Sequence, residues 1–287
     1  MNEANNPAAR LNTILKEGRG QSRTEGSISV WHRLLMVPKD NMSIFYHRLG
    51  LVVNLSHIIE TQIKCIKNIN QQLYLKEIPV VHRAFEKLNL QASFSGFIDQ
   101  ITDTVIYGVD FCSDLLSKQF PEKTIKDKNL SEIENEIKQL ITDMANSDLA
   151  EPVKAYILDH LYAILSAVQE YKFTGIKPIE EKVQFIYGTF LVNPNIYNDF
   201  QSTQFWDKFW GILNKIAIVT TIVSGLALLD HYTIHFLPNP EMEVRVKKQD
   251  KFENKLIDKL MIDSCKSVTM ATADMHRLSL PEPKGKA

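Results

Sequence analysis

The spacing of the apolar residues constrains the fold of this chain more than any other feature. Apolar side chains recur mostly three and four positions apart, and the 287 residues include only 11 glycines. This period is typical of one face of an α-helix rather than of a β-strand, whose side chains alternate. The sequence therefore predicts an all-α protein, a bundle of about seven to nine helices with a mobile N-terminal segment and a polar C-terminal extension.

Prolines and charged connections divide the predicted helices into four regions. The expected helices cover residues 40–75, 80–88, 94–120, 130–144, 153–168 and 179–192, and a last one starts after Ser202. The charged, Lys-rich stretch at 122–129 is the expected internal boundary. We expect four regions: an N-terminal clamp and linker (1–38), two helical subdomains (39–121 and 130–238) and a polar extension (239–287).

Charge and cysteine usage exclude several classes of protein. Lys and Arg total 33 against 34 Asp and Glu, a net charge of -1, so no overall field attracts nucleic acid and none is expected as a partner. Cys65, Cys112 and Cys265 form no C-x-x-C pair. Free thiols and the absence of an apolar signal region near the N-terminus predict a cytoplasmic location.

Motifs for phosphate binding, nucleophilic catalysis and kinase activity are missing from the sequence. We therefore expect no catalytic residue and no cofactor, and an enzyme is the less favoured class. His231 and His235 lie four residues apart, a spacing that places two zinc ligands on one helical face. They are weak metal candidates because the Glu of H-E-x-x-H and a third ligand are lacking. A packed or hydrogen-bonded pair is the stronger interpretation.

Four aspartates form an acidic stripe if residues 94–120 are one helix. Asp99, Asp103, Asp110 and Asp114 would then fall within about 60° of one another. A solvated outer face explains this spacing with the fewest assumptions. A basic protein partner is the second interpretation, and a Mg²⁺ site is the third.

An aromatic cluster, Trp206, Phe209 and Trp210, precedes an uncharged stretch at 216–229. Such clusters often anchor interfaces, although core packing is the stronger interpretation. The uncharged stretch spans about 21 Å as a helix, less than the roughly 30 Å of a bilayer core. Extending it to residue 237 would bury Asp230 and two histidines at a cost of several kcal/mol. A buried core helix is therefore favoured, an interfacial or oligomer-forming helix is the second interpretation, and a membrane span is the third.

The sequence as a whole favours a non-catalytic, helical protein-interaction subunit of a cytoplasmic assembly. Its partner would be another protein or a second copy of itself, bound through the acidic stripe and the aromatic cluster. The alternative is a membrane-associated effector acting through the apolar segment 216–237, and a helical nuclease or other hydrolase is third.

The opening from Asn6 to Val37, around Trp31, resembles uncharacterised bacterial proteins, some of them linked to antiviral operons. It covers little of the chain and carries no diagnostic motif. For the membrane alternative, the resemblance implies a role in a bacterial antiviral system.

Overall fold

The computed structural model describes residues 5–220 and shows an all-α fold. This part of the chain holds thirteen helices and no strand, and three of the helices have only four residues. The chain divides into two units, residues 1–233 and 234–287. The predicted polar extension at 239–287 lies outside the described residues, and the predicted division into four regions stays a prediction.

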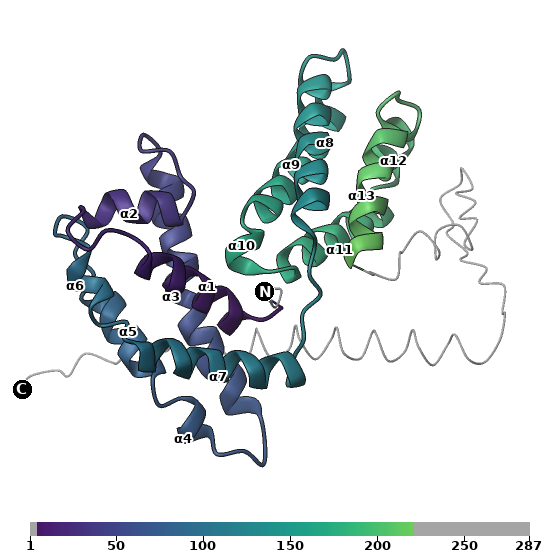
Figure 1. Ribbon diagram of the computed structural model, residues 1–287. Coiled ribbons are helices and arrows are strands. Elements are labelled where there is room, and N and C mark those ends of the chain that lie inside the picture. Colours follow the sequence, from purple (N-terminus) through teal and green to yellow (C-terminus); the bar gives the residue numbers. More distant parts are fainter. Residues whose placement is uncertain (1–4, 221–287) are drawn as a thin grey trace, which may run out of the picture. The chain divides into compact units, whose positions relative to one another are not determined.

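Seven helices precede the Lys-rich connection (Figure 1). They are α1 (Pro7–Arg19), α2 (Ser27–Leu34), α3 (Met42–Cys65), α4 (Gln71–Tyr74), α5 (Ile78–Glu86), α6 (Ser95–Ile98) and α7 (Asp103–Gln119). Six follow it: α8 (Asp127–Ala145), α9 (Glu151–Gln169), α10 (Tyr171–Thr174), α11 (Lys177–Val192), α12 (Pro194–Gln201) and α13 (Trp206–Thr220).

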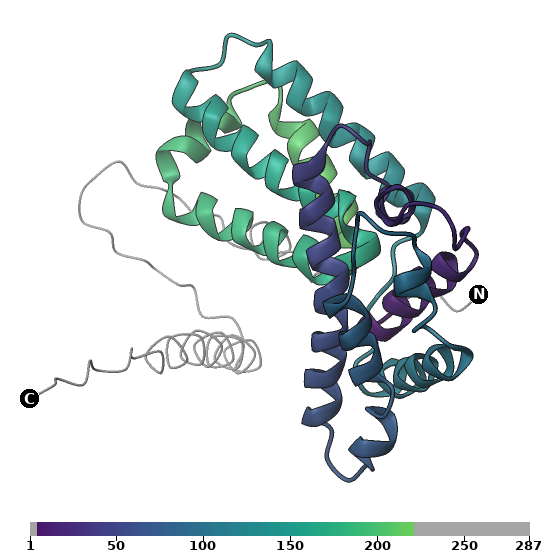
Figure 2. The same cartoon turned by 90° about the vertical axis from the view of Figure 1, so that its left-hand side faces the viewer.

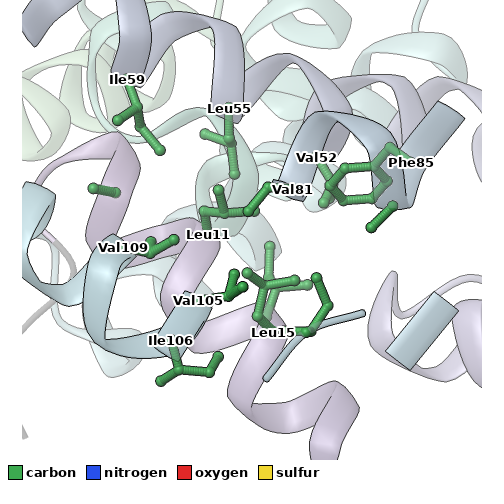
Figure 3. Close-up of a cluster of buried hydrophobic side chains, with 14 of the residues drawn as sticks. Leu11, Leu15, Val52, Leu55, Ile59, Val81, Phe85, Val105, Ile106 and Val109 are labelled. Atoms are coloured by element: carbon green, nitrogen blue, oxygen red, sulfur yellow. The ribbon is translucent and has the colours of Figure 1, made fainter. Parts of the chain in front are cut away.

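The first hydrophobic core lies where α1 packs against α3 and α7. Helix α1 begins at a favourable cap, since the Asn6 side chain accepts a hydrogen bond from the Ala9 amide at 2.9 Å. Its apolar face places Leu11 and Leu15 in one buried cluster with Leu55 of α3 and Val105 of α7 (Figure 3). Figure 2 shows α3 as the long purple-to-blue helix that α1 contacts.

The second core is formed by α8, α9, α11, α12 and α13. The predicted apolar face of 153–168 is confirmed, because Val153, Ile157, Leu161 and Ile164 are all buried in α9. The clearest periodicity in the sequence therefore corresponds to a central helix of this core.

The single helix predicted over 40–75 is wrong, because two helices occupy this range. Helix α3 ends at Cys65, Ile66 is extended, and Asn68 has a φ of 62°. Asparagine tolerates this left-handed backbone better than most residues do. The Asn70 side chain then caps α4 by accepting a hydrogen bond from the Leu73 amide at 3.3 Å. The two asparagines therefore turn the chain although the apolar period continues.

The single helix predicted over 94–120 is also wrong. Helix α6 ends at Ile98, and α7 begins anew with Thr102 as its N-cap. The residues before α6 are held by the N-terminal segment: the Phe94 amide donates to the Glu25 carbonyl at 2.8 Å, and the Ser27 amide donates to the Ala92 carbonyl at 2.9 Å. These long-range bonds fix a short separate helix where periodicity alone predicted a continuous one.

Candidate functional site

The predicted aromatic cluster lies largely inside the second core. Phe209 and Trp210 are buried, and Trp206 is half-buried. The rings of Trp206 and Trp210 meet edge to face with centroids 5.2 Å apart, and Phe209 packs in the same way on Phe200 of α12 at 5.3 Å. These contacts hold α13 against its neighbours. Because a partner could reach Phe209 only if α13 moved, the predicted partner contact stays a prediction.

The four aspartates do not share one helix. Asp99 follows α6, and Asp103, Asp110 and Asp114 lie on α7. Each carboxylate has a partner within the chain: Asp99 with Arg23 at 2.6 Å, Asp103 with Arg19, Asp110 with Asn12 at 2.6 Å and Lys16 at 3.7 Å, and Asp114 with Lys118 at 2.6 Å.

The N-terminal segment supplies most of these partners. The hydrogen bond from Arg19 lowers the pKa of Asp103 below its usual value. The surface around the four aspartates is therefore close to electrically neutral rather than acidic. Exposed pairs of this kind contribute little stability and are screened by salt.

Two exposed aromatic rings stand among these charges on α7. The side chains of Tyr107 and Phe111 are 67% and 62% exposed, one helical turn apart. Together with Asp103, Asp114 and Lys118 they span about 80° of the helix circumference, and we call these five residues the α7 face. On its edge, the ring of Tyr74 from α4 lies 6.4 Å from that of Phe111. The α7 face therefore presents aromatic surface that the described part of the chain leaves uncovered.

The remaining sequence candidates lie outside the described residues or at their end. His231 and His235 cannot be placed, and the segment 216–237 is described only to residue 220. Within residues 5–220, no helix combines the length and the apolar character required to cross a membrane. The membrane alternative stays a prediction.

A polar cavity of about 420 Å³ lies between α8 and α13. Asp143 and Lys208 both line it, and they pair with each other at 3.1 Å. The hydrogen bonds from Gln139 and Lys208 lower the pKa of Asp143, so this carboxylate is ionised at neutral pH. Because the charges of Asp143 and Lys208 neutralise each other, neither side chain is left as an unpaired charge that could bind a charged ligand in this cavity.

Sequence reasoning missed one group of metal-ligating side chains. His57 and Glu60 of α3 and His82 of α5 place ligand atoms within 4.8 Å of one another, the only such group among the described residues. The i, i+3 spacing of the first two was visible in the sequence. The 21 residues between Glu60 and His82 hid the third, because only the packing of α3 against α5 brings it near.

Comparisons with protein-family models, with characterised proteins and with solved structures found no match to this chain. The structure itself therefore defines the class of the protein, which is all-α. The resemblance of residues 6–37 to proteins of bacterial antiviral operons stays a prediction.

Proposed function

We propose that this protein is a non-catalytic helical interaction subunit and that the α7 face is its contact surface. The observation that carries the proposal is the exposure of Tyr107 and Phe111 side by side on one helix. Aromatic residues are enriched at interfaces, where they bury much area for a small loss of conformational freedom. A partner would cover both rings at once.

The charges around the rings favour packing over long-range attraction. Asp103 is paired with Arg19 and Asp114 with Lys118, so the α7 face carries almost no net charge. Exposed pairs are weak enough, at about 0–1 kcal/mol each, for a partner to rearrange them. The aromatic rings would therefore supply the affinity, and the charges would set the register.

A second copy of this chain fits the α7 face. In an antiparallel, two-fold pairing that sets Tyr107 of one copy against Phe111 of the other, four rings meet at the centre. The same register brings Lys118 of the second copy towards Asp103. It also places Asp114 of the second copy opposite Asp103, but each carboxylate keeps a cation of its own chain beside it, Arg19 for Asp103 and Lys118 for Asp114. The pairing of the same two rings in both copies is what a symmetric dimer contact requires. The protein would thus assemble through α7.

The cytoplasmic location belongs to the same proposal. Cys65 and Cys112 are free thiols, the first exposed and the second buried. Unpaired cysteines are typical of a reducing compartment.

Sedimentation of the full chain over a wide range of concentrations tests the proposal. We expect a dimer that the double variant Tyr107→Ser with Phe111→Ser weakens at least about tenfold, since interface aromatics commonly contribute more than about 1 kcal/mol each. The matched control is Tyr162→Ser with Phe185→Ser, which removes two rings that are 53% and 60% exposed on α9 and α11. This control should dimerise like the wild type.

A charge exchange tests the antiparallel register. Lys118→Asp alone should weaken the dimer, and adding Asp103→Lys should restore part of the loss. A chain that stays monomeric at every concentration, or a dimer that both aromatic double variants leave unchanged, would contradict the proposal. A different protein could instead co-purify in stoichiometric amount and be lost only from the Tyr107→Ser with Phe111→Ser variant. That result would support the α7 face as the contact surface and identify that protein, not a second copy, as the partner.

A further inference from the structure

A second group of side chains, separate from the α7 face, lies where α3 packs against α5. The imidazoles of His57 and His82 are stacked, with ring centroids 4.4 Å apart and an angle of 19° between the planes. Glu60 reaches the same place from α3, and its Oε2 lies 4.0 Å from His82 Nδ1. Two nitrogen ligands and one carboxylate thus converge from two rigid helices.

Internal hydrogen bonds do not account for this arrangement. Among the described residues, His57 and His82 have no hydrogen bond. The atom of His82 that faces Glu60 is Nδ1, and the other ring nitrogen, Nε2, is buried without any partner. The Nδ1 side of His82 therefore has no hydrogen bond that an ion would have to replace.

The Glu60 carboxylate has one oxygen directed towards the two histidines. Lys64 Nζ lies 2.6 Å from Glu60 Oε1, which leaves Oε2 directed towards His82. This hydrogen bond and the charge of Lys64 lower the pKa of Glu60. Glu60 is therefore ionised at neutral pH. His57 is exposed, so an ion in solution can reach the group.

The ligand set selects the class of ion. Two imidazoles and one carboxylate suit Zn²⁺ and related first-row metals, whereas Ca²⁺ and Mg²⁺ require more oxygen ligands. Two ligands of a tetrahedral zinc ion lie roughly 3.4 Å apart. The atoms here lie within 4.8 Å of one another, so each pair must approach by at most about 1.4 Å. Side-chain rotation of exposed His57 and half-buried Glu60 can supply this movement.

We infer that His57, Glu60 and His82 form a binding site for a divalent transition-metal ion such as Zn²⁺. The three side chains hold the ion between α3 and α5, and the remaining coordination position is open to water. An ion bound there links the two helices. The site is independent of the α7 face, so metal binding and dimer formation are separate properties of the chain.

Metal binding to the full chain tests this site. A chelator first removes any bound metal from the protein, and the chelator is then removed. Zn²⁺ is titrated against a chromophoric competitor, and the absorption spectrum of added Co²⁺ reports the number and type of ligands. We expect one Zn²⁺ per chain. His82→Gln and Glu60→Gln should each weaken binding at least about tenfold, because even residues that only orient ligands commonly account for factors of 10–100. Circular dichroism confirms that each variant is folded.

Two further variants separate the site from a general effect of histidine or charge. His47→Gln is the matched control, because His47 is also on α3 and meets a single carboxylate, Glu170, at 3.0 Å. It should leave the affinity unchanged. Lys64→Gln removes the competing cation and should bind Zn²⁺ at least as tightly as the wild type.

The inference would be overturned by the absence of saturable Zn²⁺ binding. It would equally be overturned by zinc that binds the His82→Gln variant with unchanged affinity, including zinc held instead by His231 and His235. Weaker binding by Lys64→Gln would also contradict the geometry.

Discussion

Gly175, between α10 and α11, has two independent reasons to be glycine. Its φ of 74° and ψ of -160° fall in a region that is essentially restricted to glycine. A Cβ atom built on it would lie 2.8 Å from Arg10 Cζ and would overlap Glu122 Oε2. Arg10 is only 5% exposed and forms a bidentate pair with Glu122. Gly175→Ala therefore strains the backbone and displaces a buried ion pair at the same time.

The expected loss of stability follows from these two effects. The backbone conformation costs an alanine about 1–3 kcal/mol. Breaking a buried pair outright costs about 3–5 kcal/mol, and displacing it without full separation costs a fraction of that. We expect Gly175→Ala to lower the free energy of unfolding by about 4 kcal/mol, a large part of the 5–15 kcal/mol that is typical of natural domains.

Urea unfolding followed by circular dichroism measures this loss. Gly188→Ala is the matched control, since Gly188 lies inside α11 and its added Cβ would meet nothing within 4 Å. It should stabilise the helix by about 0.5–1 kcal/mol. In an Arg10→Met background, the Gly175→Ala penalty should fall towards the backbone cost alone. A Gly175→Ala variant within about 1 kcal/mol of the wild type would refute both the assigned conformation and the contact.

Three further predictions concern buried groups. Trp31 is fully buried among three phenylalanine rings, so Trp31→Ala should cost about 3–5 kcal/mol in urea unfolding, and a loss below about 1 kcal/mol would contradict its place in the core. Burial raises the pKa of Cys112 to about 12, whereas Cys65 is exposed. Iodoacetamide should therefore modify Cys65 in the native protein and Cys112 only after denaturation, and peptide mapping that found equal rates would count against this. Burial lowers the pKa of His160 below its usual 6.5, so the folded state takes up this proton at a lower pH than the unfolded state does. The stability that His160 contributes above about pH 6.5 should be lost as the pH falls through the lowered pKa, and unfolding of His160→Gln should depend less on pH; an unchanged pH dependence would show that other groups control it.

Helical periodicity predicted the fold class and many buried positions because it reports local geometry. The apolar face of α9 was visible in the sequence, since residues three and four apart share one side of a helix whatever it packs against. Helix ends were harder to predict. The turn at Asn68 depends on a left-handed residue, and the start of α7 at Thr102 depends on a cap. Both are short signals inside a continuing apolar pattern.

The exposure of aromatic residues could not be predicted in the same way. Phe209 of α13 and Phe111 of α7 both occupy helices, but only the first has another helix over it. Phe209 meets Phe200 because α12 folds back beside it, whereas α4 reaches Phe111 only at its edge, through Tyr74, and leaves the ring exposed. Burial depends on the neighbouring helix, and one helix's own sequence does not encode it. For the same reason, the sequence did not predict that His82 lies beside His57, because the packing of α3 against α5 determines it.

The acidic residues show why the partner of a charge is harder to predict than the charge itself. Arg19 and Arg23 in the N-terminal segment could have met an acidic partner outside the chain, and the aspartates could have met a basic one. In the structure they meet each other, across more than 70 residues of sequence. Because these pairs are exposed, added salt screens them and weakens their contribution to a contact. The packing of the aromatic rings depends much less on salt. If the α7 face binds a second copy mainly through Tyr107 and Phe111, added salt should therefore weaken the dimer only slightly, whereas a contact made by freed aspartates would dissociate.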